Sequence, residues 1–194
     1  MIRIRHRVNA IDDLAALAPG IGAEIDLRSR GDRIVLNHDP FLDGDDLEAW
    51  LDRWADGTPR GTLVLNPKED GLEDRVRAAL GARGVDDWFF LDLPVPTMVR
   101  LACREGEPRV AVRASEWEPI EAARAFAGRA AWAWLDSFTG APPPVDVARA
   151  LAADFRVCLV SPELQRQPAD RIDAFLHLAP HLAAVCTKHP ERWR

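Results

Sequence analysis

Short apolar segments alternate with amphipathic segments along almost the whole chain. Thr62–Leu65 is one continuous apolar run, as expected of a strand covered on both faces. Eight such segments predict strands, seven of them as single runs and one as the first arm of a hairpin over 22–41. The seven runs cover residues 2–6, 62–65, 88–91, 109–112, 131–135, 156–160 and 183–186.

Between these segments the apolar residues recur at spacings of three and four, which predicts helices. Within 45–55, Trp50 and Trp54 follow this spacing, so we expect both tryptophans to face the core. The first helix is expected over 10–18, with Asn9 as its cap. The predicted helices cover residues 10–18, 45–55, 72–83, 96–104, 119–127, 145–153 and 169–178.

Strict alternation of strands and helices implies parallel strands joined by right-handed crossovers. Eight strands in this order predict an α/β protein that forms a small (β/α)8 TIM barrel, with residues 1–194 as a single domain. An open doubly wound sheet is the alternative, but no glycine-rich phosphate loop follows the first strand. Since the last strand ends near Cys186, we expect the eighth helix to be short or absent. A homodimer whose partner subunit covers that flank is the hypothesis that follows.

The hairpin over 22–41 interrupts the alternation. Glu24 and Asp26 stand two apart on its first arm and therefore face the same side, with Cα atoms about 6.5 Å apart. The return arm brings His38 and Asp39 to the following loop. Paired acids on a strand are most often a solvated face. The alternative is that they hold a hard divalent cation beside a histidine that transfers protons.

Polar residues follow the carboxyl end of nearly every predicted strand. In a parallel barrel these ends meet on one face, where barrel enzymes carry their chemistry. Single residues such as Asp92 or Ser161 could simply start a loop or cap a helix. Together the strand ends combine histidines, acids and cations: His6, Arg7, Glu24, Asp26, His38, Asp39, Asn66, Lys68, Asp92, Arg113, Glu116, Trp134, Asp136, Ser161, Glu163, Thr187 and Lys188.

This mixture of side chains predicts metal-assisted cleavage of a phosphate ester. Carboxylates on one strand suit Mg²⁺ or Ca²⁺, which prefer oxygen ligands. Arginine and lysine beside a cation suit an anionic substrate, and phosphate is the obvious candidate. Two histidines can serve as acid and base near neutral pH, while the metal stabilises charge on the phosphoryl oxygens.

Composition narrows the class of protein further. The chain of 194 residues is 47% hydrophobic and 29% charged, which is ordinary for a globular protein. Its net charge of −6 argues against general nucleic-acid binding. Cys103, Cys158 and Cys186 are widely spaced near apolar runs, so buried thiols are expected and neither a zinc site nor a disulfide framework is indicated. No apolar run would span a bilayer, and the first residues lack a signal-peptide core, so we expect a cytoplasmic location.

Three short motifs coincide in order and spacing: His6-Arg7 after the first strand, Glu24-Ile25-Asp26 on the second, and His38-Asp39-Pro40 after the hairpin. They resemble the glycerophosphodiester phosphodiesterase and phosphatidylinositol phospholipase C-like barrels. Asn66-Pro67-Lys68 stands where that family has Glu-x-Lys, and Thr187-Lys188-His189-Pro190 stands where it has Thr-Asp-x-Pro. The resemblance runs over the whole chain and is strongest in the first 70 residues.

The resemblance implies a metal-dependent phosphodiesterase in which a hydroxyl next to the phosphate, or water, displaces the leaving alcohol. It does not say which histidine is the acid and which the base. The implied roles are acid–base catalysis for His6 and His38, metal binding for Glu24 and Asp26, and phosphate contact for Arg7 and Lys68.

The departures from the family pattern bear on metal and substrate. Asn66 replaces the glutamate that is the family's third metal ligand, and an amide oxygen brings no charge, so the affinity for Mg²⁺ or Ca²⁺ should fall. Arg113 is a further candidate for contact with the phosphate. The segment after His38 leaves no room for the lobe that shapes the glycerol pocket in many relatives, so we expect a small or head-group-like diester. Trp117 and Trp134 are expected at the mouth, where they either pack or stack against substrate.

Three functions remain open from the sequence. The first is the metal-dependent phosphodiesterase, favoured by His6 and His38. The second is a barrel that binds phosphate or metal and has lost turnover, favoured by Asn66. The third is a metal-dependent sugar-phosphate isomerase or aldolase with Lys68 as a Schiff base, against which the neighbouring acids Glu69 and Asp70 speak.

Overall fold

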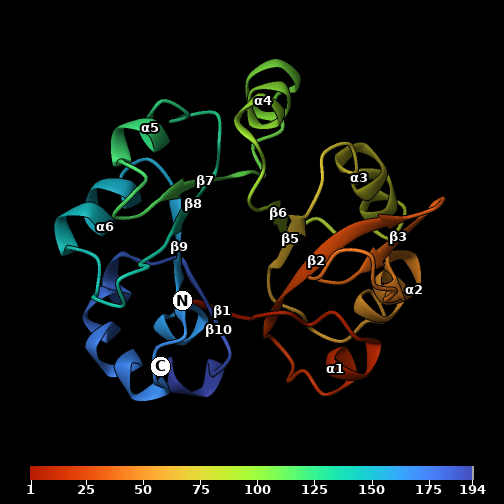
Figure 1. Ribbon diagram of the computed structural model, residues 1–194, viewed down its shortest axis with the longest axis horizontal. Helices are drawn as coiled ribbons and strands as arrows, with labels where there is room; N and C mark the ends of the chain where they lie inside the picture. The colour runs from red at the N-terminus through yellow and green to blue at the C-terminus, as the bar shows by residue number, and fades with distance from the viewer. Residues whose placement is uncertain (194) are drawn as a thin grey trace.

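One curled sheet dominates the structure, and helices cover its outer side (Figure 1). The computed structural model of the chain describes residues 1–193. Eight strands run parallel, paired in the order β6–β5–β2–β1–β10–β9–β8–β7. They are β1 Ile2–Arg5, β2 Gly22–Arg30, β5 Leu63–Pro67, β6 Trp88–Phe90, β7 Ala111–Ala114, β8 Trp132–Leu135, β9 Arg156–Val160 and β10 Ala184–Thr187.

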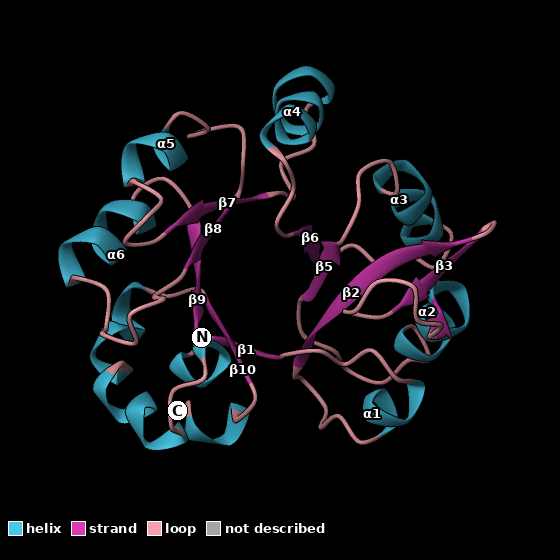
Figure 2. Cartoon of the chain, viewed as in Figure 1, coloured by secondary structure: helices cyan, strands magenta, loops and turns pink. Residues whose placement is uncertain are grey.

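The two ends of this ladder, β6 and β7, approach each other (Figure 2). One isolated bridge joins them, between Phe90 and Val110, and the amide of Phe90 donates to the carbonyl oxygen of Arg109 at 2.9 Å. The predicted α/β class and the curled parallel sheet are therefore confirmed. A continuous ladder around the barrel is not formed by the described residues, because β6 and β7 share this single bridge.

The hairpin forms as predicted. β3, Arg33–Leu36, pairs antiparallel with β2. Just past the end of β3, the amide of Asn37 donates a hydrogen bond to the carbonyl oxygen of Asp26 at 3.1 Å. The short strand β4, Asp45–Asp46, was not predicted and adds to the free edge of β3. Asp46 also caps the following helix, because its side chain accepts hydrogen bonds from two backbone amides of the first turn.

Helices follow most of the strands and lie outside the sheet. None of those in the described residues has the length and apolar character needed to cross a membrane. The helices are α1 Ile11–Ala15, α2 Leu47–Trp54, α3 Glu73–Gly81, α4 Val95–Met98 with a π-helix over Val99–Glu105, α5 Ile120–Arg124 and α6 Val145–Ala152.

The prediction of an α-helix over 169–178 was wrong in the type of helix. The segment forms two 3₁₀ helices, Ala169–Ala174 and Leu176–His181. The buried side chains Ile172, Phe175 and Leu178 recur every three residues. This spacing matches the three residues per turn of a 3₁₀ helix better than the 3.6 of an α-helix.

Alternation along the strands divides the core into an outer and an inner layer. Ile25 and Leu27 belong to the outer layer with α2, in which Trp50 and Trp54 stack with ring centroids 5.2 Å apart. The prediction that these tryptophans face the core is confirmed. The inner layer fills the space enclosed by the sheet with Ile4, Val64, Phe89, Leu91, Ala111, Trp132, Trp134, Cys158, Val160, Ala184 and Cys186.

The cysteines are free thiols, as expected from their spacing. Cys158 and Cys186 are fully buried in the inner layer, which confirms the prediction for them. The prediction was wrong for Cys103, which is exposed on the π-helix while Leu101 and Ala102 beside it take the buried positions.

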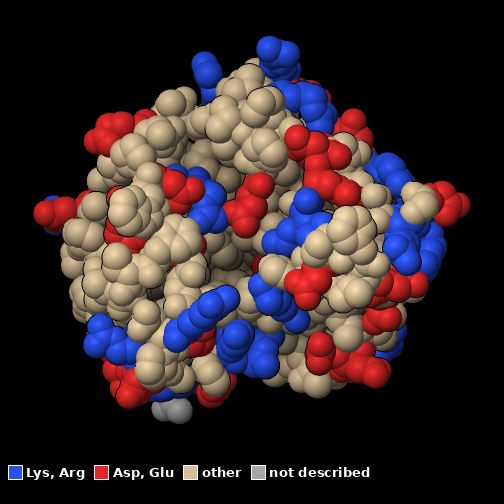
Figure 3. Space-filling view, viewed as in Figure 1, with Lys and Arg blue, Asp and Glu red and all other residues tan. Residues whose placement is uncertain are grey.

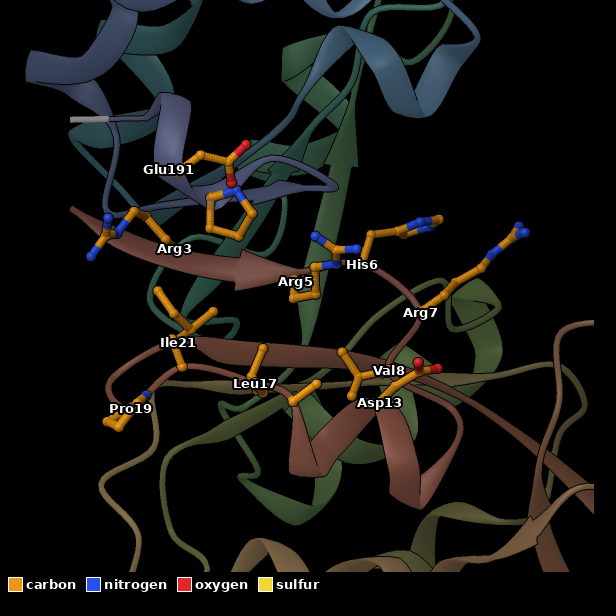
Figure 4. Close-up of a pocket in the computed structure, with 13 residues that line it drawn as sticks. Arg3, Arg5, His6, Arg7, Val8, Asp13, Leu17, Pro19, Ile21 and Glu191 are labelled. Atoms are coloured by element: carbon orange, nitrogen blue, oxygen red, sulfur yellow. The ribbon is translucent and has the colours of Figure 1, made fainter.

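In residues 1–193, no α-helix follows β10 to cover the outer face of β1. After β10 the described residues form only a 3₁₀ helix, Pro190–Arg192, as the prediction of a short eighth helix requires. A groove of about 480 Å³ lies between this segment and α1 (Figure 4). Its lining includes Arg3 and Arg5 from β1 and the apolar side chains of Leu17 and Ile21. The homodimer expected to cover this flank remains a prediction.

Gly22 begins β2 where the backbone of the next strand leaves no space for a side chain. A Cβ there would lie 2.3 Å from the carbonyl oxygen of Thr62 and 3.1 Å from Cγ1 of Ile4. We predict that Gly22→Ala lowers the free energy of unfolding by about 1–3 kcal/mol, as overpacking does, measured by urea denaturation. Gly81→Ala is the control, because a Cβ at the end of α3 meets nothing within 4 Å. Equal stability of the two variants would contradict the prediction.

Candidate active site

A pocket of about 290 Å³ opens where the carboxyl ends of the strands meet. Acidic and basic side chains surround a hollow on this face (Figure 3). Six of the predicted site residues line the pocket: His6, Arg7, Glu24, Asn66, Arg113 and Trp134. The rest of the lining is Leu91, Asp92, Asp136, Phe138, Val160, Leu164 and Gln165.

Glu24 and Asp26 point to the same side of β2, and each carboxylate is only 1% exposed. Parallel pairing with β5 sets Asn66 beside Asp26. The side-chain amide of Asn66 donates to Oε1 of Glu24 at 3.2 Å. Lys68 follows β5, and its Nζ lies 2.9 Å from Oδ1 of Asp26. The four residues therefore form one buried polar cluster, as the strand register requires.

The loop after β1 completes this cluster. Arg7 has a left-handed backbone with φ of 55°, and its amide donates to Oε2 of Glu24 at 2.9 Å. Asn9 binds Asp26 twice, by donating from Nδ2 to Oδ2 and by accepting from the backbone amide, both at 2.9 Å. The prediction that Asn9 caps α1 was wrong, because its side chain is engaged here. Asp45 instead accepts the hydrogen bond from the amide of Ile11.

His6 and Glu24 have oppositely shifted pKa values. Burial, and secondarily the Arg7 cation, lower the pKa of His6 to about 4. Burial and the neighbouring Asp26 carboxylate raise the pKa of Glu24 to about 7. His6 Nε2 lies 3.8 Å from Glu24 Oε2, while His6 Nδ1 is buried without a hydrogen-bond partner in the described chain. Near neutral pH the imidazole is therefore neutral and able to accept a proton, beside a carboxyl that exchanges one.

Arg113 stands on the opposite wall among three carboxylates. It pairs with Asp92, with Glu118 at 2.7 Å and with Asp136 at 3.1 Å. Burial alone would lower the pKa of Arg113, but these carboxylates raise it overall. Asp92 has a left-handed backbone with φ of 57°, a conformation that costs free energy in a residue other than glycine. The guanidinium is thus fixed in position, with its charge already balanced within the protein.

His38 lies at the edge of this arrangement and does not line the pocket. Its side chain is 41% exposed, and its Nδ1 is 2.9 Å from Oδ1 of Asp39. Its carbonyl oxygen accepts hydrogen bonds from the guanidinium of Arg28, which fixes the loop against β2. The structure therefore brings His6 to the buried carboxylates but leaves His38 on the loop outside the pocket.

The two predicted aromatic residues are placed differently. Trp134 lines the pocket and is buried, whereas Trp117 is 76% exposed and outside it. The second aromatic side chain in the pocket lining is Phe138, which lies in a loop where no periodic pattern marks it. Glu116 holds this loop by accepting hydrogen bonds from the amide of Phe138 at 3.1 Å and from Thr139 Oγ1 at 2.6 Å.

The predicted metal ligands Glu24 and Asp26 are surrounded by nitrogen atoms of the chain. No group of three or more His, Cys, Asp or Glu side chains in the described residues has a metal-binding arrangement. All four carboxylate oxygens of Glu24 and Asp26 already face nitrogen atoms of the chain. The amide oxygen of Asn66 is buried without a hydrogen-bond partner, but it is a single neutral ligand and brings no charge to attract a divalent cation.

Solved structures match this chain over nearly its whole length. No family model matches the sequence, and no curated protein matches it. A structure from Galdieria sulphuraria, described as a glycerophosphodiester phosphodiesterase, has a TM-score of 0.74 at 14% identity and covers 98% of this chain and 94% of its own. A glycerophosphodiester phosphodiesterase from Agrobacterium tumefaciens has a TM-score of 0.72 at 12% identity, over 100% of this chain and 98% of that one.

A third match has a bound product. It is an Oleispira antarctica phosphodiesterase in complex with sn-glycerol-3-phosphate, with a TM-score of 0.67 at 19% identity, covering 100% of this chain and 95% of that one. At these identities the likeness shows the fold. The chain therefore shares the fold of the glycerophosphodiester phosphodiesterases, as its three motifs predicted.

The carboxylate of Glu116 makes the Phe138 loop sensitive to acid. Burial raises the pKa of Glu116, but hydrogen bonds from Thr139 and Phe138 outweigh burial and bring it to about 2, below the ordinary 4.5. A depressed pKa contributes stability above the ordinary value, and this contribution is lost as the pH falls towards 2. We predict that wild type is more stable than Glu116→Gln at pH 6, and that the difference shrinks between pH 4.5 and 2 in urea denaturation.

Glu121→Gln, an exposed change on α5, is the control for loss of one carboxylate. It should differ little from wild type at every pH. A gap between wild type and Glu116→Gln that stays constant with pH would contradict the prediction.

Proposed function

We propose that the chain is a phosphoric diester hydrolase that acts on a small or head-group-like phosphodiester. The observation that carries this proposal is the neutral imidazole of His6, 3.8 Å from Glu24, in a pocket that Arg7 and Arg113 also line. A fold shared with glycerophosphodiester phosphodiesterases supports it. The motifs His6-Arg7, Glu24-x-Asp26 and His38-Asp39 support it as well.

The proposed mechanism begins with the phosphate anion held by Arg7 and Lys68, with Arg113 on the far wall. His6 accepts the proton of water, or of a hydroxyl next to the phosphate, as its oxygen attacks phosphorus. The bond from phosphorus to the leaving alcohol breaks, and that oxygen takes up a proton. We assign this second transfer to His38 on the strength of the His38-Asp39 motif, in which Nδ1 of His38 lies 2.9 Å from Oδ1 of Asp39. The cations stabilise the charge that develops on the phosphoryl oxygens.

The substrate would be compact. The lining of the pocket includes the polar side chains of His6 and Arg7 and the apolar side chains of Trp134, Phe138 and Leu164. We infer that Trp134 and Phe138 contact the alcohol portion of the diester. Trp117 has no part in this, because its side chain is exposed away from the pocket lining.

We further infer that residues 1–194 act as a single phosphodiesterase-like domain, a small (β/α)8 barrel closed between β6 and β7. The bridge from Phe90 to Val110 supports this, because it brings the two ends of the parallel ladder into contact. Closure places Asp92 and Arg113 on one wall of the same pocket, which they line together.

The second candidate function is a barrel that binds phosphate without turning it over. Asn66 favours it, because the amide donates to Glu24 where the family pattern has a metal-binding glutamate. The two candidates differ in one property, which is whether the protein releases alcohol from a diester.

We predict that the protein hydrolyses bis(p-nitrophenyl) phosphate and that His6→Ala and His38→Ala each lower kcat by about 10²–10⁴-fold, the usual contribution of general acid–base catalysis. The measurement is release of p-nitrophenol at pH 7. His177→Ala is the matched control, because His177 is exposed on the 3₁₀ helix Leu176–His181, where its Nδ1 lies 2.9 Å from the carbonyl oxygen of Ala174. Phosphate binding in calorimetry without any turnover would favour the binding barrel over the hydrolase.

A further inference from the structure

We propose that Lys68 replaces the divalent cation at this site, so that its ammonium group, and no metal, faces the phosphoryl group during the reaction. The inference rests on the proposed function, and it concerns which group supplies positive charge to the phosphoryl oxygens. It is carried by the strand register at the end of β5, by the partners of the two buried carboxylates and by the balance of charges among them.

The register of β2 and β5 places Lys68 next to the two buried acids, Glu24 and Asp26. Asp26 pairs with Asn66 and Leu27 with Pro67, and the amide of Lys68 continues the ladder by donating to the carbonyl oxygen of Leu27 at 2.9 Å. The side chain then reaches Oδ1 of Asp26, and only 18% of it is exposed. The ammonium is therefore a built part of the site and is not a solvated surface charge.

Each carboxylate oxygen already has a partner from the chain. Glu24 receives the amide of Arg7 on Oε2 and the side chain of Asn66 on Oε1. On Asp26, Oδ2 accepts a hydrogen bond from Asn9, while Oδ1 has the ion pair with Lys68 and no hydrogen bond from the described residues. A divalent cation would have to displace these nitrogen atoms before it could reach the oxygens, and the buried donors would lose their own partners.

The charges also balance without a metal. Glu24 and Asp26 contribute at most two negative charges, and Lys68 and Arg7 contribute two positive ones, with Arg7 Nε 3.8 Å from Asp26. A glutamate at position 66 would add a third negative charge to this cluster and call for further positive charge. The neutral side chain of Asn66 removes that requirement, so Asn66 and Lys68 act together.

Lys68 keeps donors for a substrate. An ammonium group has three hydrogens, and Asp26 occupies one of its directions. Lys68 also lines a second cavity, of about 410 Å³, which shares Asn66 and Asp92 with the main pocket. A phosphoryl oxygen held there is stabilised by a fixed positive charge as its own charge grows. Lys68 forms no covalent bond in this role, and its pairing with Asp26 speaks against a Schiff base.

The first test is wild-type hydrolysis of bis(p-nitrophenyl) phosphate in EDTA and after addition of Mg²⁺, Ca²⁺ or Mn²⁺. We expect the same rate in all four conditions. Lys68→Met should lose activity by about 100-fold or more, as removal of a stabilising donor does, and no metal should restore it. Lys68→Arg should recover part of the rate, because it restores the charge. Loss of wild-type activity in EDTA with recovery in a divalent metal would overturn the proposal.

A second test reads metal binding directly and does not depend on turnover. Thermal unfolding of wild type should be unchanged by Mg²⁺ or Ca²⁺, whereas the double variant Asn66→Glu/Lys68→Met should melt at a higher temperature with either cation. Arg104→Met, which removes one exposed positive charge from the π-helix, is the control and should behave as wild type in both tests.

The two tests separate this inference from the proposed function. If wild type hydrolyses no diester in any condition, the hydrolase proposal fails, and the melting experiment alone decides the role of Lys68. A rise in melting temperature confined to the double variant would then support charge replacement. A rise in wild type with Mg²⁺ or Ca²⁺ would overturn it.

Discussion

Two carboxylates buried on one face of β2 impose the strongest constraint on this end of the molecule. A buried charge without a partner is costly, so Glu24 and Asp26 can be kept only if the surrounding chain supplies donors and positive charge. The loop after β1 turns back through the left-handed Arg7 to provide an amide, and Asn9 follows to hold Asp26. Lys68 arrives from the neighbouring strand. The donors and cations around Glu24 and Asp26 are thus the same groups that make it possible to bury these two carboxylates.

The sequence was sufficient for the fold class and for most of the cluster, and the reason is geometric. Parallel strands in register carry their last residues to one face, so a list of strand ends is also a list of neighbours. For this reason the strand ends alone predict the cluster of Glu24, Asp26, Asn66 and Lys68. The motif resemblance also indicated which known fold the chain has, and solved structures with that fold match the chain at 12–19% identity.

What the sequence could not give depends on contacts between distant segments. Asn9 precedes a helix, and asparagine is a residue type that often caps helices. Its side chain instead makes two hydrogen bonds with Asp26. The positions of His38, Trp117 and Phe138 are set by loops, whose course follows from side chains such as Arg28 and Glu116 rather than from periodicity. The 3₁₀ helices near the end of the chain were also missed. Apolar residues three apart occur in α-helices as well, where spacings of three and four alternate, so the sequence pattern does not distinguish the two helix types.

The single bridge between β6 and β7 gives the sheet a seam. Asp92 and Arg113 lie just beyond it on either side, and their ion pair joins the two strand ends where backbone hydrogen bonds do not. Dissolved salt weakens partly exposed ion pairs far more than it weakens a backbone ladder. Ionic strength therefore acts on the contact that holds this wall of the pocket together, while the opposite wall has the β1–β2–β5 backbone ladders in addition to its ion pairs.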